Sequence, residues 1–477
     1  MPSIRNGIGI DRTQLSGGYN PITVAHITRV AQQGGTIDSP ALLNLYVQYL
    51  VTNGLMSSQY IGAIPSVTGY KEGSVAGNCQ IVFSVDPARS TTGSYIGDMV
   101  QNTVVNQPKL LKYSGERYAK GYFGGYITTS SYTSINNRDF DWVITVKADN
   151  DSVGALFSLE WTALNGVGTT LIRESDGSYT INHSGVTHTG FLANITLSSK
   201  FWVKLECIAM HQYNLYFSND GIVYGAAILA NFSSSGGAGY NLDILYVSTD
   251  KITNGTDCNI YDFTYNNATN GNNFKLDLAA YNPKVSETTW TATTGETWTL
   301  NRPVTNATAY QSTIVTRTKY QVKNSIYLTS GTIPFGTDIT FLDIRTLLMP
   351  FLANDAALFQ GQEYLKSTIF YSTNSGIHLG YLSGATLTQP SLNKNTIFTF
   401  FRKDAGGTKA QENKGTIVTA AGQYDSGALT QIRQIGYVDI YQTASDINGF
   451  ISLSGDSVSD NNLKDFLNTT IFNGEIY

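Results

Sequence analysis

The chain has 477 residues, of which 41% are hydrophobic and only 14% are charged; the net charge is −5, and 46 residues are glycine. Globular proteins carry about 25% charged residues on average, so this composition argues against a helical cytosolic enzyme and favours mainly β structure. The lysines and arginines are scattered and form no run that could follow a phosphate backbone, which excludes nucleic acid as an expected partner.

Neither a signal peptide nor a membrane segment is evident in the sequence. Residues 1–7 lack the apolar core of a signal peptide, and no run of about 18 apolar residues occurs, so we expect no membrane contact. Cys79, Cys207 and Cys258 are odd in number and lack metal-site spacing, which predicts buried thiols. The composition nevertheless resembles extracellular, glycan-facing β proteins. Synthesis in a host cytoplasm followed by release on a virus particle would reconcile these features.

The first predicted element is a helix over residues 39–53. Ser39 is a suitable N-cap, Pro40 fits the first helical position, and Asn53-Gly54 provides a stop. Apolar residues recur at helical spacing at Leu42, Leu43, Tyr46, Tyr49 and Leu50. So wide an apolar face must be buried, either on the following domain or in a subunit contact. We assign residues 1–68 as a docking or oligomerisation segment with these five side chains as its assembly residues, and deletion of 1–65 is expected to leave folded β domains that no longer associate.

Period-two patterns follow from about residue 71. The run 141–147 places Trp142, Ile144 and Val146 on one strand face, and the run 201–208 alternates in the same way. There, Val203, Leu205 and Cys207 are predicted inward, and Lys204 and Glu206 outward. Asp176-Gly177 and Asp220-Gly221 are typical of two-residue hairpins. Strands at this spacing without intervening helices indicate an antiparallel sandwich, assigned to residues 69–305.

A second β-rich domain is predicted over residues 306–477. Its strand candidates are Ser325–Leu328, Thr368–Tyr371, Thr396–Phe401 and Gly436–Tyr441. One helix candidate, Asp343–Leu352, is interrupted by Pro350, and a short terminal helix is predicted over Asp460–Leu467 with Ser459 or Asp460 as its cap.

The order of several segments resembles the concanavalin A-like (laminin G-like) jelly roll over about residues 70–275. The segments are 101–108, 121–127, 138–144, 201–205, 214–221 and 255–263. Residues 27–55 resemble helical leaders that precede such domains in tailed-phage virion proteins, and 281–284 and 294–298 look similar to the end of the same arrangement. This resemblance implies a mainly β fold, with one or two antiparallel jelly-roll sandwiches behind a short N-terminal helical segment.

The sequence gives little support for catalysis. His183 and His188 flank a turn, where a pair that is hydrogen-bonded or faces solvent is favoured over a metal site. Hydrolases with this kind of sandwich usually carry alternating carboxylates on one strand, whereas Glu160, Glu174 and Glu206 are isolated. We therefore predict a non-enzymatic protein and keep a polysaccharide hydrolase as the third alternative.

Two kinds of binding residue remain as hypotheses. Trp161, Glu160 and Tyr179 are candidates for glycan contact, against the alternative that a strand Trp fills the core. Asp149 and Asp151 could bind Ca2+, as could Asn219-Asp220, against the alternative that they only hydrogen-bond their own turns. Apart from Ca2+, no cofactor is expected.

The resulting hypothesis is a structural virion protein of a tailed phage, either a head decoration or fibre protein or a tail component. Its lectin-like sandwiches would contact other virion proteins, further copies of the chain or host surface polysaccharide. The alternative is a secreted or cell-surface glycan-binding lectin.

Overall fold

The computed structural model describes most of the chain between residues 18 and 477. The described residues are 18–55, 61–85, 98–121, 126–129, 135–136, 141–160, 168–183, 186–209, 211–231, 241–242, 244–247, 257–269, 271, 273–286, 288–301, 313–322, 338–345, 356–361, 368–372, 376–379, 386–388, 395–403, 407–420, 432–435, 437–438, 441–442, 445–454 and 461–477. Within them, every strand pairing is antiparallel, so the predicted mainly β, antiparallel fold is confirmed.

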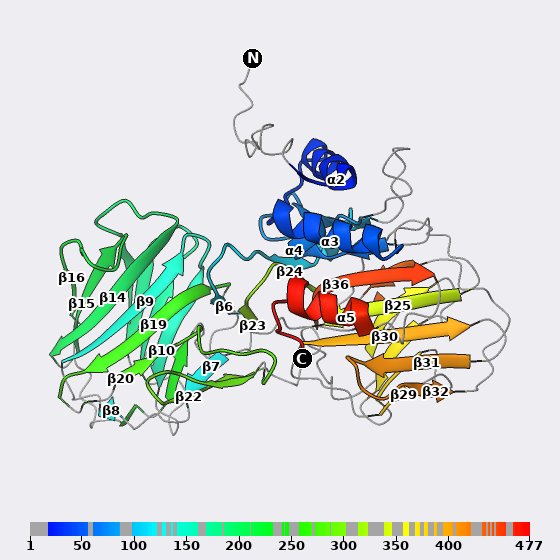
Figure 1. Ribbon diagram of the computed structural model, residues 1–477. Coiled ribbons are helices and arrows are strands. Elements are labelled where there is room, and N and C mark those ends of the chain that lie inside the picture. Colours follow the sequence, from blue (N-terminus) through cyan, green and yellow to red (C-terminus); the bar gives the residue numbers. More distant parts are fainter. Residues whose placement is uncertain are drawn as a thin grey trace, which may run out of the picture.

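Two lobes lie side by side (Figure 1). One, here called the inserted sandwich, is built from residues 118–315. The other, the terminal lobe, is built from chain on both sides of that insertion, residues 18–112 and 318–477. The chain therefore starts in the terminal lobe, leaves it to form the sandwich, and returns.

The inserted sandwich contains two large sheets, here called the back sheet and the front sheet. The back sheet runs in the order β13 (Val186–Phe191), β12 (Tyr179–His183), β11 (Gly168–Arg173), β10 (Gly154–Glu160), β18 (Ile244–Val247), β7 (Tyr126–Thr129), β22 (Thr297–Asn301) and β21 (Thr289–Thr291). The front sheet runs β16 (Ile228–Asn231), β15 (Gln212–Ser218), β14 (Lys200–Ala209), β9 (Trp142–Asp149), β19 (Asn259–Asn267), β6 (Tyr118–Lys120) and β23 (Thr313–Val315), with β20 (Asn273–Lys275) beside β19. A separate short pair joins β8 (Ile135–Asn136) to β17 (Asn241–Leu242).

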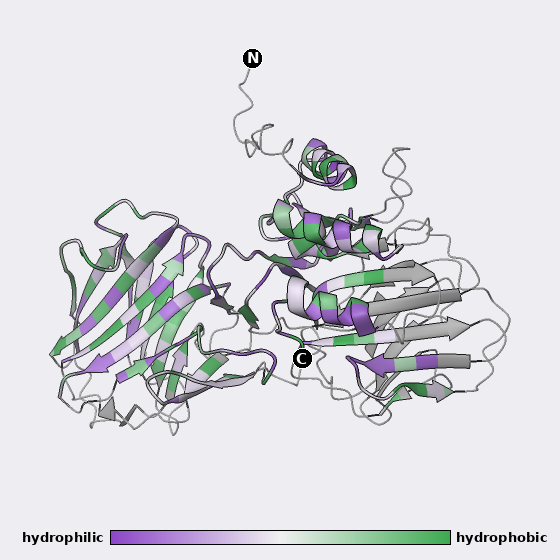
Figure 2. Cartoon of the chain, viewed as in Figure 1, coloured by the Kyte–Doolittle hydropathy of each residue, from purple (hydrophilic) through white to green (hydrophobic). Residues whose placement is uncertain are grey.

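The sandwich core lies between these two sheets. Trp142, Ile144 and Val146 of β9 are buried, as their alternation predicts. Val203, Leu205 and Cys207 of β14 are buried too. Phe263 of the front sheet meets Trp298 of the back sheet edge to face, with ring centroids 6.3 Å apart. Figure 2 shows the resulting alternation of hydrophobic and hydrophilic residues along the strands.

Both Asp-Gly pairs lie in turns, but neither turn has only two residues. Residues 174–178 connect β11 to β12, and Gly177 has a φ of +84°, which a glycine adopts without steric cost. Residues 219–227 connect β15 to β16. There the Asp220 carboxylate accepts hydrogen bonds from the backbone N–H groups of Ile222 and Val223, both at 2.8 Å, and so holds a wider loop.

The terminal lobe is also built on sheets. Its largest runs β32 (Val418–Ala420), β31 (Gly407–Glu412), β30 (Thr396–Lys403), β25 (Asp338–Arg345), β36 (Ser445–Ser454), β24 (Lys319–Val322) and β5 (Lys109–Leu111), with β1 (Ile61–Ala63) also on β36. A second runs β29 (Thr386–Leu387), β28 (Gly376–Leu379), β27 (Thr368–Ser372), β26 (Ala356–Gly361) and β33 (Ile432–Ile435). Smaller sheets are formed by β2 (Tyr70–Glu72), β3 (Cys79–Val82) and β4 (Met99–Val100), and by β34 (Tyr437–Val438) with β35 (Tyr441–Gln442).

Helices pack over the largest sheet of the terminal lobe (Figure 1). They are α2 (Pro21–Gln32), α3 (Pro40–Thr52), α4 (Pro65–Thr68) and α5 (Asn461–Phe466), which continues as a π-helical turn, η2 (Leu467–Ile471). Helix α2 lies on α3 rather than on the sheet itself. A 3-10 turn, η1 (Val104–Asn106), precedes β5. Helix α3 confirms the predicted helix, and the Ser39 hydroxyl accepts a hydrogen bond from the Leu42 N–H as a cap. Among the described helices, none is long and apolar enough to cross a membrane.

The apolar face of α3 is buried within its own chain. Leu43, Tyr46 and Leu50 are fully buried in one cluster with residues of β30, β36, α5 and η2. Tyr49 stacks on Phe466 of α5, with ring centroids 3.9 Å apart, and Leu42 packs against the same cluster. Of the two alternatives for this face, packing against the rest of the chain is the one observed. The assignment of these side chains to a subunit contact is therefore corrected.

The domain boundaries predicted at 68/69 and 305/306 also differ from the structure. Strand β1 pairs with β36 and β5 pairs with β24, so the described residues 61–85 and 98–111 belong to the terminal lobe rather than to the sandwich. The sandwich also extends to β23, which pairs with β6. Sequence order hides this arrangement because the two parts of the terminal lobe are about 200 residues apart along the chain.

Two further element predictions are wrong. Asp343–Arg345 end strand β25, where pairing with β30 on one side and β36 on the other overrides the local helical pattern, and residues 346–352 lie outside the described part. Gly436–Tyr441 is not one strand, because Val438 of β34 pairs with Tyr441 of β35 in a reversal of direction.

The other predictions in this region fare better. Strands β27 and β30 and helix α5 confirm three predicted elements. Ser325–Leu328 and the proposed caps Ser459 and Asp460 lie outside the described residues.

Candidate functional site

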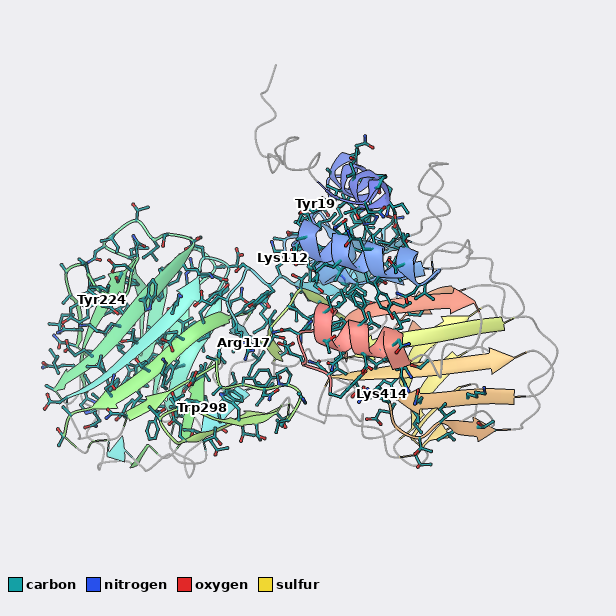
Figure 3. The ribbon with its side chains drawn as sticks, viewed as in Figure 1. Tyr19, Lys112, Arg117, Tyr224, Trp298 and Lys414 are labelled. Atoms are coloured by element: carbon teal, nitrogen blue, oxygen red, sulfur yellow. The ribbon has the colours of Figure 1, made fainter. Side chains whose placement is uncertain are left out.

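Among the described residues, a groove lies on the outer face of the front sheet, where the chain enters the inserted sandwich. Its volume is about 540 Å³. It is lined by Tyr113, Gly115, Glu116, Arg117, Lys147, Trp202, Tyr261, Asp262, Lys275, Leu276, Asp277, Leu278 and Ala279. Figure 3 places Arg117 between the two lobes and Tyr224 on the part of the sandwich away from the terminal lobe. We call the outward side chains of β9, β14, β15, β19 and the loop 219–227 the front face.

Strand alternation brings a lysine and a tryptophan together on this face. Lys147 of β9 is directly opposite Trp202 of β14 in the sheet, and both residues alternate with buried neighbours. The Lys147 Nζ lies 4.9 Å from the centroid of the Trp202 ring, which is a cation–π contact. A Cβ atom at Gly221 would approach this indole to 2.9 Å, so the loop 219–227 packs closely against it. The Trp202 ring is thus half-buried and held from two sides.

A β-bulge adds a second aromatic ring to the groove. Between Ile260 and Asp262 the pairing of β19 with β9 shifts by one residue, and Tyr261 is the extra residue. Its ring lies 4.2 Å from the Lys200 Nζ, and its hydroxyl donates a hydrogen bond to Asp149 Oδ2 at 3.0 Å. The bulge therefore places Tyr261 and Asp262 together on the outer side of the sheet. There the Tyr261 ring is largely buried, at 9% exposure, in a small cluster with Leu111, Tyr118 and Val315.

Glu116, in the connection between β5 and β6, lies across two lysines of the front sheet. Its Oε1 is 2.5 Å from Lys147 Nζ and its Oε2 is 2.9 Å from Lys200 Nζ. Burial alone would raise the pKa of the Glu116 carboxyl, but the hydrogen bonds and positive charges of the two lysines outweigh it and lower that pKa. Glu116 is therefore ionised at neutral pH.

The front face continues past the groove with two more tyrosines. Lys204 Nζ lies 4.0 Å from the ring centroid of Tyr216 and 5.0 Å from that of Tyr224. The Tyr216 hydroxyl donates to Glu206 Oε2 at 2.7 Å, and desolvation together with Glu206 raises the pKa of Tyr216. The phenol of Tyr216 thus stays protonated, and Glu206 is engaged as its acceptor.

The groove carboxyls differ in their surroundings. Burial raises the pKa of Asp262, with Lys275 and Lys147 opposing that shift. The pKa of Asp277 is lowered despite burial, because its carboxylate accepts hydrogen bonds from the Thr293 hydroxyl at 2.7 Å and from nearby backbone N–H groups. Asp277 therefore has a structural role in its loop.

The three residues predicted to contact glycan do not form a site. Tyr179 is fully buried on β12 against Phe217, with ring centroids 4.9 Å apart, so its assignment as a glycan contact is wrong. The physical reason is register: pairing with β11 and β13 turns this tyrosine into the core. Trp161 and the Glu160 side chain lie outside the described residues.

The turn around Asp149 and Asp151 shows the hydrogen bonds of a structural turn. Asp149 Oδ1 accepts from the Asp151 N–H at 3.1 Å and the Ser152 hydroxyl at 3.1 Å. Its Oδ2 accepts from Asn259 at 2.9 Å and from Tyr261. Across the described part of the chain, no three His, Cys, Asp or Glu side chains gather in an arrangement that could hold a metal ion.

His183 has a neighbour that the sequence did not suggest. Its Nε2 is 2.6 Å from Nδ1 of His211, while its Nδ1 is 3.0 Å from both the Thr169 and Tyr213 hydroxyls. Burial and the neighbouring His211 lower the pKa of His183 to about 4. This is a neutral, hydrogen-bonded histidine of the sandwich, in line with the structural alternative.

Part of the front face was readable from sequence. The outward alternation of Lys147, Trp202 and Lys204 follows from the same period-two pattern that predicts the core. Glu116 and Tyr261 were missed. Nothing local predicts that a connecting residue reaches two strands, or that a bulge turns a tyrosine outward.

Comparison with known proteins gives fold resemblance only. No family model matches the chain, and no curated protein matches it. Domains LG4-5 of the mouse laminin alpha1 chain are 11% identical, with 76% of this chain and 88% of that chain covered and a TM-score of 0.25. A Trypanosoma rangeli sialidase in complex with the inhibitor DANA is 8% identical, with 64% and 61% covered and a TM-score of 0.24.

A third similar structure is the binding domain of botulinum neurotoxin DC in complex with SialylT. It is 11% identical, with 73% of this chain and 82% of that chain covered and a TM-score of 0.21. None of these three proteins is described as a virion component. At such identities and TM-scores, an argument about function has to come from the side chains of this chain.

Proposed function

We propose that this chain is a non-catalytic carbohydrate-binding protein and that the front face of the inserted sandwich is its binding surface. The observation that carries this proposal is the half-buried Trp202 ring, which lies with lysine ammonium groups and the edge of a buried cluster around Tyr261 along a groove of about 540 Å³. Aromatic faces provide apolar contact area for the C–H side of a sugar ring, and neighbouring polar groups bond its hydroxyls.

The rigidity of this face supports the same reading. Trp202 is held by Lys147 and by the close approach of Gly221, and the Tyr261 hydroxyl is fixed on Asp149. Side chains ordered before binding lose little conformational entropy when a ligand arrives. A groove open on one side also suits a polymer better than an enclosed small molecule.

The groove carboxyls favour binding over hydrolysis. Glycoside hydrolysis needs a proton donor and a second carboxylate that is free to act on the sugar or on water. Asp262 has the raised pKa of a donor, but Glu116 is engaged by two lysines and Asp277 by its own loop. A polysaccharide hydrolase is kept as an outcome of the test.

The finer assignment, a structural protein of a tailed-phage virion, is part of the same proposal. Its support is the order of the sequence segments described above. In addition, the inserted sandwich lies beside the terminal lobe rather than within it, so in this proposal the terminal lobe attaches to other virion proteins or to further copies while the sandwich binds glycan (Figure 1). Mass spectrometry should then find the chain at stoichiometric level in the particle fraction of a lysate. Its recovery only outside particles would favour a secreted or cell-surface lectin.

Binding itself is tested with immobilised host-envelope polysaccharides, measuring both retention of the protein and release of reducing ends. Trp202→Ala should weaken retention about 3- to 10-fold, because an aromatic contact contributes about 0.5–1.5 kcal/mol. Trp202→Phe keeps a ring and should lose less. Leu192→Ala, at an exposed residue just beyond the end of back-sheet strand β13, is the matched control. Equal retention by all variants would reject the front face, and reducing ends released by wild type but not by Asp262→Asn would establish a hydrolase.

A further inference from the structure

The position of Glu116 suggests which class of carbohydrate the groove takes. We propose that the ligand is an acidic polysaccharide and that a carboxylate of one of its uronic acid units binds between Lys147 and Lys200, where the Glu116 carboxylate now lies. This inference rests on the proposed function and adds the ligand class to it.

The two lysines form a preformed carboxylate site. They project from neighbouring strands, with Lys147 opposite Trp202 and Lys200 opposite Asp149 in the pairing of β9 with β14. Each bonds a different oxygen of the same carboxylate, at 2.5 Å and 2.9 Å. Each carboxylate oxygen thus has its own lysine donor. A single hydroxyl group has only one oxygen and cannot bond both lysines in this way.

An aromatic ring lies directly beside this site. The centroid of Tyr261 is 4.2 Å from Lys200 Nζ and 5.9 Å from Lys147 Nζ. In a uronic acid the carboxylate is attached to the sugar ring itself. A ligand carboxylate between the lysines would therefore bring its sugar ring next to Trp202 and to the small accessible part of Tyr261, which line the groove together with Tyr113.

Glu116 can leave the site without disturbing the sandwich core. It belongs to the connection between β5 and β6 rather than to a strand, and its side chain is 39% exposed. The lysine side chains are less exposed, at 17% and 30%. Ion pairs this close to solvent hold their partners weakly. Without an anion, however, the two ammonium groups would repel each other, so a departing Glu116 leaves a site that favours another carboxylate.

The other charged groups of the groove restrict the preference for a carboxylate to the position between Lys147 and Lys200. Asp262 lies near Lys147 and Lys275, while Asp149 bonds Tyr261 and Asn259. The groove is therefore not uniformly positive. This arrangement favours binding of one carboxylate at one position of the groove over a general attraction of any polyanion.

The experiment compares retention of the full chain on polygalacturonate and on neutral dextran for wild type, Glu116→Gln and Lys200→Met. Removing the internal carboxylate should strengthen polygalacturonate retention about two- to five-fold and leave dextran retention unchanged. Lys200→Met should weaken only polygalacturonate retention. Glu72→Gln, which removes an ion pair of the terminal lobe with Lys112, is the matched control and should change neither. Unchanged thermal unfolding of each variant shows that the sandwich is intact.

The outcomes separate this inference from the proposed function. If dextran is retained through Trp202 while polygalacturonate retention does not respond to Glu116→Gln or Lys200→Met, the acidic-ligand inference is wrong and carbohydrate binding stands. Equal strengthening on polygalacturonate and on a sulfated dextran would show general polyanion attraction and also overturn the inference. Absence of retention on both polymers, for wild type and Glu116→Gln alike, overturns both proposals.

Discussion

The two lobes differ in which parts of the chain contribute their buried cores. The inserted sandwich closes its core from one continuous stretch, since the members of its main cluster all lie between Ala119 and Ile314. The terminal lobe joins residues from both ends of the chain, so that Leu43 shares a cluster with Leu463 and Ile476. The sandwich can in principle fold once its own residues are made. The terminal lobe needs the whole chain, and its stability depends on contacts that span the insertion.

The largest expected effect comes from deleting residues 1–65. The helical pattern alone predicts that this deletion leaves folded β domains, but the deletion removes Leu43, Tyr46 and Leu50 from a closed core and β1 from β36. Each large-to-small loss in a core costs about 2–5 kcal/mol, so the terminal lobe should unfold. Calorimetry should show the sandwich transition alone. Two transitions like those of the full chain would mean that α3 is dispensable and that the nested arrangement is wrong.

A buried arginine offers a more local way to open the terminal lobe. Arg317 donates hydrogen bonds to the carbonyls of Ile471 and Phe472 and pairs with Glu475, with both side chains about nine-tenths buried. Arg317→Met leaves the Glu475 carboxylate with only the Thr316 hydroxyl, at 3.0 Å, and the more distant Arg117, at 3.9 Å, and should cost about 3 kcal/mol. Urea unfolding should show the loss in the terminal lobe.

The double variant Arg317→Met with Glu475→Leu is the control for this effect. It replaces both charges and should recover much of the stability that the single variant loses. If Arg317→Met shifted the unfolding transition of the sandwich as far as that of the terminal lobe, the two lobes would not unfold as separate units.

Each lobe also contains one histidine that is buried in its neutral form. In the terminal lobe, burial and the nearby Arg29 lower the pKa of His26 to about 4, although the Thr68 carbonyl, 2.7 Å from its Nε2, opposes the shift. In the sandwich, burial and the neighbouring His211 lower the pKa of His183 to about 4. Unfolded histidine titrates near 6.5, so the unfolded state binds protons first as the pH falls.

Stability contributed by these histidines is therefore complete above about pH 6.5 and is lost as the pH falls toward 4. The loss should be up to about 3 kcal/mol for each lobe. Unfolding followed between pH 7 and 4 should show His26→Gln reducing the acid sensitivity of the terminal lobe only, and His183→Gln that of the sandwich only. An acid response that neither variant changes would assign it to carboxyl groups instead.

The same contrast explains what could be predicted from the sequence. Alternation predicts the faces of Trp142 and Ile144, and capping predicts the start of α3 at Ser39, because both depend on neighbours within a few residues. Some partners of Leu43, such as Leu463 and Ile476, lie more than 400 residues away, and Glu116 meets a lysine 84 residues further on. No local pattern encodes either contact.

The failure at Tyr179 has a related cause. An aromatic residue on a strand fits either face, and only the pairing of β12 with β11 and β13 decides which. The binding face is in this respect harder to predict than the core. Its strand residues follow the alternation, but Glu116 and Tyr261 depend on tertiary structure and on a bulge.

The smallest expected effect comes from a matched pair of glycines, one in each lobe. Gly54 follows α3 with a φ of +66°, and Gly177 lies between β11 and β12 with a φ of +84°. At Gly54 a Cβ atom would meet nothing within 4 Å, and at Gly177 it would only approach the end of the Arg173 side chain, at 3.8 Å. Replacement by alanine therefore adds backbone strain without a clash, at a cost of about 1 kcal/mol in each case.

Because the two costs are similar, this pair tests whether the lobes unfold independently. Gly54→Ala should lower the midpoint of the terminal-lobe transition alone, and Gly177→Ala that of the sandwich alone, each by a few degrees in calorimetry. The double variant should show both shifts unchanged, since sites in separate units add. A shift of both transitions by either single variant would show that the linking strands β5, β6, β23 and β24 couple the lobes into one cooperative unit.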